Sequence, residues 1–210
     1  MNQPSDITAH VSDADRFELR LAEGRKWEEA VDEWLQSPVI NAMVLANYNC
    51  RDASGQPPRI RSRKVARITP DMLVLTQQRT VFVEVKSKAG FFVDRDGKES
   101  TGIDLLYWQD YLACQQAGAH IVIFFIHRAT AEVRVASITE LDAHPGKWTR
   151  RHPPHPTAGD QGMIYWPQDV GRLVARIVDE AAEERRLRTI TRSAPWFTPD
   201  QAGSAAPPAP

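Results

Sequence analysis

Hydrophobic and polar residues alternate with two different periods along this chain, and the two periods predict both helices and strands. From Trp27 onward, apolar residues recur at i, i+3, i+4, i+7 and i+8, which predicts a helix over about 13–36 that Pro38 ends. Two apolar stretches, 72–76 and 81–86, flank the polar segment Gln-Gln-Arg-Thr. This arrangement is typical of two strands joined as a hairpin.

The second half of the chain contains further candidates for both kinds of element. A helical pattern over 102–117 ends at a glycine, and an almost wholly apolar run over 120–127 predicts a buried strand. Another strand is expected over 132–137. Residues 142–167 are rich in His and Pro and are expected to be irregular. Apolar residues at helical spacing predict a final helix over about 169–190.

The order of these elements predicts an α/β fold with a central mixed β-sheet flanked by helices. Residues 39–48 fit either a strand or a short helix, and 63–69 alternate loosely, as a strand does. We expect a disordered N-terminus over 1–12, a single domain over 13–192 that ends in the C-terminal helix, and a disordered Ala/Pro-rich tail over 193–210.

Composition narrows the class of protein without naming a function. The 210 residues are 42% hydrophobic and 25% charged, as in ordinary globular chains, and no apolar run approaches the length of a membrane span. The two cysteines have no CxxC spacing, which argues against a disulfide scaffold and a cysteine zinc site. The first 20 residues contain no apolar signal segment. We therefore expect a cytoplasmic protein with no membrane partner.

The net charge of −1 hides a local excess of positive charge. Residues 51–67 hold six basic residues and one acidic residue. The cations nearest the predicted hairpin are Arg59, Arg61, Arg63, Lys64 and Arg67. They are candidates for contacts with backbone phosphates, or they simply keep a loop solvated. The segment Trp-Thr-Arg-Arg-His over 148–152 has the same two interpretations, with its aromatic ring and cations either flanking nucleic acid or exposed in a loop.

Candidate chemistry lies in the predicted hairpin. Glu84 and Lys86 share one face of their strand, because side chains alternate in direction along a strand. If the two strands pair, Asp71 lies at the same end as Glu84. Two carboxylates suit Mg²⁺, which also takes water and phosphate oxygens as ligands. The alternative is a purely structural ion pair, since a carboxylate inside an apolar strand needs a compensating charge.

Two further side chains are candidates for this site. At about 100° per residue, Glu28 falls on the border of the apolar stripe of the first helix, where a carboxylate can reach into a site or remain solvated. Gln109 falls within an apolar face formed by Leu105, Trp108 and Leu112. It is expected either to satisfy a neighbouring backbone group or to point at the metal site.

The segment Pro70-Asp71 … Glu84-Val85-Lys86 resembles the PD-(D/E)xK motif of restriction-endonuclease-like nucleases. Within that superfamily it is most similar to the Holliday-junction resolvase and virus-type replication-repair nuclease branches. The G-x3-E of their first helix is matched by Gly24 and Glu28. The 13-residue gap between Asp71 and Glu84 also fits, and the resemblance covers about residues 20–137.

This resemblance implies a restriction-endonuclease-like core with the order α-β-β-β-α-β and a metal-dependent nuclease that hydrolyses phosphodiester bonds in DNA. Asp71, Glu84 and the carbonyl of Val85 would be metal ligands, with Mg²⁺ as cofactor and Mn²⁺ as substitute. Lys86 would be the catalytic lysine. Glu28 and Gln109 would support catalysis, and Lys88 matches a second lysine of the family that we group with the nucleic-acid-binding residues. A catalytically inactive binding or interaction module of the same fold is the alternative, and a homodimer remains open.

Overall fold

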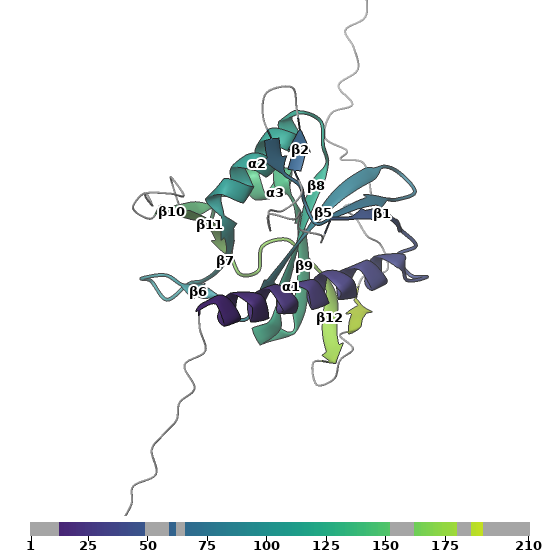
Figure 1. Cartoon of the computed structure of the whole chain (residues 1–210). Helices are drawn as coiled ribbons and strands as arrows, with labels where there is room; N and C mark the ends of the chain where they lie inside the picture. The colour runs from purple at the N-terminus through teal and green to yellow at the C-terminus, as the bar shows by residue number, and fades with distance from the viewer. Residues whose placement is uncertain (1–12, 49–58, 62–65, 152–161, 180–185, 191–210) are drawn as a thin grey trace, which may run out of the picture.

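The computed structural model describes residues 13–48, 59–61, 66–151, 162–179 and 186–190 (Figure 1). Its largest element is a seven-stranded sheet, in the order β1 (Met43–Asn47), β4 (Met72–Leu75), β5 (Thr80–Lys88), β8 (Ile121–His127), β9 (Glu132–Ser137), β12 (Arg172–Asp179) and β13 (Arg186–Thr189). A four-stranded sheet has the order β10 (Trp148–Arg151), β11 (Gly162–Pro167), β7 (Glu99–Asp104) and β6 (Phe92–Val93). A two-stranded hairpin consists of β2 (Arg59–Arg61) and β3 (Ala66–Ile68).

The helices cover opposite faces of the large sheet. α1 (Asp13–Gln36) crosses one face (Figure 1), while α2 (Leu105–Gln116), α3 (Ile138–Ala143) and the small sheet lie on the other. A short 3-10 helix, η1 (Arg128–Thr130), follows β8. β5 and β8 run parallel, and the other paired strands of this sheet are antiparallel. The expected α/β class with a mixed sheet is confirmed. The structure also places β1–β7 between α1 and α2, which is more strands than the expected order contains.

The alternation of side chains along β8 creates two hydrophobic cores. Val122, Phe124 and Ile126 pack with the α1 face of the sheet, while Ile121 and the residues in phase with it pack with α2 and α3. All seven residues of β8 are buried. This explains why the strand reads as a continuous apolar run rather than as an alternating one.

The expected first helix is confirmed, and its apolar stripe is buried against the sheet. Trp27, Val31 and Leu35 are fully buried. Trp34 meets Phe124 edge to face, with ring centroids 5.8 Å apart. None of the helices in the described part of the chain has the length and hydropathy that crossing a membrane requires.

The expected C-terminal helix over 169–190 is wrong, because the described part of this stretch forms β12 and β13. Register shifts interrupt β12 between Leu173 and Ala175 and between Ile177 and Asp179. Such irregularities break the two-residue alternation of a strand, so its buried residues fall at spacings that look helical. Gly171, with a φ of +77°, turns the chain just before β12.

The expectation of irregular structure over 142–167 is also wrong in its described part, where β10 and β11 form a regular antiparallel pair. Ile164 and Trp166 alternate into the core beside α2 and α3. A β-carbon at Gly102, on the neighbouring strand β7, would come within 2.6 Å of the Tyr165 ring. Only glycine therefore lets that ring lie across β7. Residues 1–12 and 193–210, expected to be disordered, lie outside the described part of the chain.

Candidate functional site

The pairing of β4 with β5 brings the two predicted carboxylates to the same face of the large sheet. Met72 pairs with Val83, and both residues are buried against α1. Their neighbours Asp71 and Glu84 therefore point to the opposite face, towards α2. The expected hairpin is confirmed, and its register places Asp71 next to Glu84.

Direct contacts join this group. The backbone N–H of Val85 donates a hydrogen bond of 2.7 Å to Asp71 Oδ2. Lys86 Nζ forms an ion pair with Glu84 Oε1 and lies 4.8 Å from the centroid of the Tyr107 ring. Glu84 is only 1% exposed, and its Oε2 atom has no hydrogen-bond partner among the described residues. The site thus keeps one buried carboxylate oxygen with spare capacity to accept.

Burial and mutual repulsion raise the pKa of the Asp71 carboxyl well above its usual range. The Glu84 carboxylate is the strongest of the nearby charges, and the ammonium of Lys86 only partly offsets it. Burial opposes the charge on Lys86, but the carboxylates of Glu84 and Asp71 outweigh it and raise the pKa of Lys86. Lys86 is therefore held as an ammonium at neutral pH.

Glu28 reaches the same electrostatic environment from α1. Burial and the charge of Glu84 raise the pKa of Glu28 to about 7, and Lys86 and Arg25 act in the opposite direction. Gly24 lies one helical turn earlier, and a β-carbon there would be 3.9 Å from Glu28 Oε1. Three carboxylates thus share the Lys86 ammonium, and Arg25 also acts on Glu28, so negative charge still exceeds positive charge when all three carboxylates are ionised.

α2 contributes two tyrosines that the sequence did not assign to the site. Tyr111 is fully buried, and burial followed by the charges of Glu84 and Asp71 raises the pKa of its hydroxyl. Within the described residues this hydroxyl makes no hydrogen bond of acceptable geometry, although its interaction with the Glu84 side chain contributes to the raised pKa. Together with Tyr107, it forms the side of the site that faces α2. The spacing of four residues between them was the available signal.

Gln109 is exposed, so its expected position on the buried face of α2 is wrong. The buried residues of this helix are Leu105, Trp108, Asp110, Tyr111 and Cys114. At about 100° per residue, the buried side of the helix is centred near Tyr111. Gln109 points to nearly the opposite side of the helix. Asp110, rather than Gln109, satisfies a backbone group, since it accepts a 3.0 Å hydrogen bond from the Ile68 N–H.

Lys88 continues the face of β5 that carries Glu84 and Lys86. Burial and the neighbouring charge of Lys86 lower the pKa of Lys88 to about 8, while Asp104 acts in the opposite direction. Asp104, at the end of β7, therefore lies near this lysine. Lys88 extends the positive charge of the site towards the segment that leads to β6.

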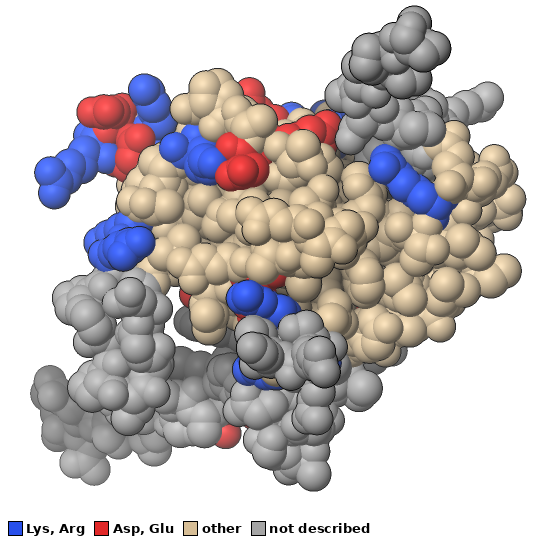
Figure 2. All heavy atoms as spheres, turned by 90° about the horizontal axis from the view of Figure 1, so that it is seen from above, with Lys and Arg blue, Asp and Glu red and all other residues tan. Residues whose placement is uncertain are grey.

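The five cations of residues 59–67 have different surroundings. Arg59 is exposed, whereas Arg67 forms a 2.8 Å ion pair with Asp110 that ties β3 to α2. Arg63, Lys64 and the side chain of Arg61 lie outside the described part of the chain. On the face shown in Figure 2, Lys and Arg side chains occur in separate groups, several of them beside acidic ones.

The chemistry of the donor set fits a divalent cation. Asp71 and Glu84 offer hard carboxylate oxygens, and the Oε2 atom of Glu84 is buried without a partner. No cluster of three or more His, Cys, Asp or Glu side chains placed to hold a metal occurs within the described residues. Mg²⁺ does not need one, because it is commonly bound through one or two carboxylates together with water and phosphate oxygens.

Comparison of the chain with protein-family models, with curated proteins and with solved structures gave no match. Any assignment of function therefore depends on the geometry described above and on the sequence motif.

Proposed function

We propose that this protein is a metal-dependent nuclease that hydrolyses phosphodiester bonds in DNA. The observation that carries the proposal is the charged group around the buried Glu84 of β5, where Asp71, just before β4, and Lys86 lie beside it with more negative than positive charge. Perturbed carboxylates held together at a cost in electrostatic repulsion are more frequent at functional sites than elsewhere. The resemblance of these residues to the PD-(D/E)xK motif supplies the reaction class and the choice of DNA.

In this proposal Asp71, Glu84 and the Val85 carbonyl hold the cation. When bound, Mg²⁺ or Mn²⁺ supplies charge for the phosphate oxygen and makes a bound water more acidic. Lys86 is already an ammonium, so it stabilises the negative charge that develops on the phosphate and does not act as a base. Glu28, with a pKa of about 7, is suited to accept a proton from the attacking water.

The test is a substrate panel of duplex, nicked, branched and single-stranded DNA, together with RNA, each incubated with Mg²⁺, Mn²⁺ or EDTA. We expect cleavage of at least one DNA substrate with either metal and no cleavage in EDTA. Lys86→Ala should lower the cleavage rate by about 100-fold or more while nucleic-acid binding is retained. Lys26→Ala, on the exposed face of α1, is the matched control.

Unchanged cleavage by Lys86→Ala would contradict the assignment of the site. Binding of nucleic acid without cleavage of any substrate would instead favour the non-catalytic module.

A further inference from the structure

A second group of side chains, on the small sheet, belongs to neither hydrophobic core. Trp148 on β10 stacks on Tyr165 of β11, with ring centroids 4.5 Å apart and planes inclined by 20°. Phe92 on β6 lies 4.8 Å from Tyr165 and 5.6 Å from Trp148. β6 and β10 are the two edge strands of this sheet, and the missing side chain at Gly102 leaves room for the rings to meet.

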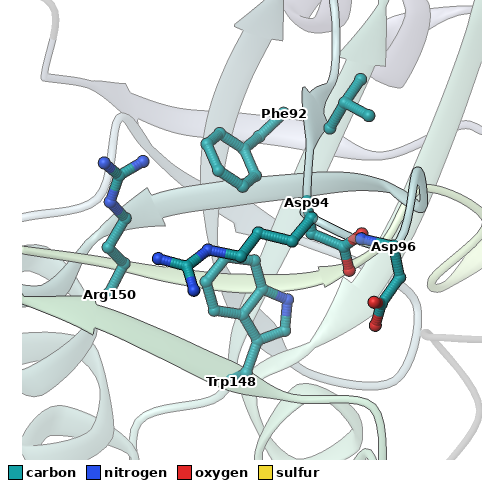
Figure 3. Close-up of a pocket in the computed structure, with 7 residues that line it drawn as sticks. Phe92, Asp94, Asp96, Trp148 and Arg150 are labelled. Atoms are coloured by element: carbon teal, nitrogen blue, oxygen red, sulfur yellow. The ribbon is translucent and has the colours of Figure 1, made fainter.

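A pocket of about 540 Å³ opens beside these rings. Figure 3 shows Phe92 and Trp148 on its walls, with Arg150 on one side and Asp94 and Asp96 on the other. Arg95 and Val93 complete its lining. This volume is within the range of small-ligand sites. Tyr165 is buried beneath, whereas Phe92 and Trp148 are only half-buried, so their rings are accessible from the pocket.

The charges around the pocket restrict its ligand. Arg150 lies over the Phe92 ring, with 5.5 Å between its guanidinium carbon and the ring centroid. Arg95 is exposed at the same pocket. Two arginines disfavour a cationic ligand such as a methylated lysine, although aromatic rings alone would suit one. The Oδ1 atom of Asp94 accepts hydrogen bonds from the backbone N–H groups of Asp96 and Lys98, which hold this side chain against its own turn.

An aromatic wall beside arginines matches a group that has a flat π-face and an attached phosphate. Nucleobases stack on aromatic side chains, and Arg binds the neighbouring phosphate. An unpaired base is required, because a base inside a duplex presents no free face. The exposed carboxylate of Asp96 is available to accept from an amino group on the edge of such a base.

The position of the pocket in the chain links it to the carboxylate site. The segment after Lys88 leads through Phe91 to Phe92, and β7 returns to Asp104 and α2. Phe91 is anchored by an edge-to-face contact with the buried His127, at 4.7 Å between centroids. The hairpin that carries Phe92 is therefore held directly against the end of β5 and β8.

We propose that the pocket lined by Phe92, Trp148, Arg95 and Arg150 binds an unpaired nucleobase of single-stranded nucleic acid. The choice of a polymer rests on the proposed nuclease function, and the inference assigns to that function a substrate with a single-stranded segment.

The experiment measures binding in EDTA, so that no cleavage is required. Fluorescence anisotropy with a labelled oligodeoxyadenylate gives the affinity for a single strand, and the same strand in a duplex gives the comparison. We expect the single strand to bind more tightly. Trp148→Ala should weaken its binding by about 5- to 100-fold, and Trp148→Phe should keep most of the affinity because it retains a ring.

Arg150→Gln tests the same pocket without removing an aromatic ring, in case Trp148→Ala fails to fold. It should weaken single-strand binding and reduce the salt slope by about 0.7 for one lost phosphate contact. Val178→Ala, an exposed apolar residue on β12, is the control and should change neither affinity nor slope.

Two results would overturn the proposal. One is that Trp148→Ala and Arg150→Gln bind the single strand as tightly as the wild type does, and the other is that the wild type binds the duplex more tightly than the single strand. Competition by free dAMP as effective as that of the oligonucleotide would overturn the choice of a polymer and assign the pocket to a nucleotide. If binding depends on the pocket but no metal-dependent cleavage occurs, the proposed nuclease function is refuted and the proposed nucleobase pocket stands. Cleavage with unchanged binding by the variants would refute the pocket alone.

Discussion

Strand β5 has two faces that differ in chemistry although they belong to the same segment of chain. Val81 and Val83 are fully buried against α1 and are surrounded by apolar side chains. On the face towards α2, Glu84 is equally buried and Lys86 is half-buried, but both are charged. The first face can be explained by folding alone. The second carries an electrostatic cost that folding does not require, and we attribute it to function.

The first way to sharpen this comparison is to alter two adjacent residues where β4 begins, Asp71 and Met72, whose side chains point to opposite faces of the sheet. Met72→Ala opens a cavity beneath α1 and should lower the free energy of unfolding by about 2–5 kcal/mol. Chemical denaturation measures this loss. A loss below that range would mean that the α1 face is less tightly packed than the structure shows.

Asp71→Asn should instead raise the free energy of unfolding. Asparagine keeps an oxygen that can accept from the Val85 N–H and removes a charge that Glu84 repels. In EDTA at slightly alkaline pH, we expect the free energy of unfolding to rise by about 0.5–2 kcal/mol. Thermal unfolding of this variant beside Met72→Ala checks the contrast. Destabilisation by Asp71→Asn would show that the carboxylate is there for structure.

Glu28 makes the stability of the folded protein depend on pH. Its pKa is about 7 in the folded protein and 4.5 when unfolded, so the folded state holds the proton more tightly. The stability from Glu28 is present below about pH 4.5 and is lost as pH rises through about 7. His127 acts in the opposite direction, because burial lowers its pKa to about 4.

The difference between Glu28→Gln and wild type isolates the contribution of Glu28. In EDTA the advantage of the glutamine variant should grow as the pH rises from about 4.5 to about 7 and then level off. Thermal melts across this range measure the difference. Glu33→Gln, on the exposed side of α1, should show none of this change. A flat difference for Glu28→Gln would place Glu28 in solvent.

Local patterns predicted the parts of the fold and site that depend on neighbouring residues. The hairpin and strand alternation were sufficient to place Asp71 beside Glu84. Gln109 was placed wrongly because the buried side of α2 is set by what packs on it, which the helix sequence does not contain. Only the tertiary structure brings Tyr111 of α2 to Glu84.

The errors about β12 and the aromatic pocket also arise because these features depend on residues that are distant in the sequence. β12 was taken for a helix because its register shifts disturb the strand period, and those shifts depend on pairing with β9 and β13. The aromatic pocket depends on a sheet in which Gly102 leaves room for the Tyr165 ring, on which side chains from both edge strands pack. The sequence motif around Trp148 indicated aromatic and basic residues together, but not the partner strands that make a pocket of them.

The central claim is that the charged face of β5 is a divalent-cation site, and Mn²⁺ binding followed by electron paramagnetic resonance tests it most directly. We predict saturable binding by the wild type that Asp71→Asn and Glu84→Gln each abolish, whereas Glu29→Gln, exposed on α1, leaves it unchanged. The absence of saturable binding by the wild type, or binding that survives both site variants, would contradict the account.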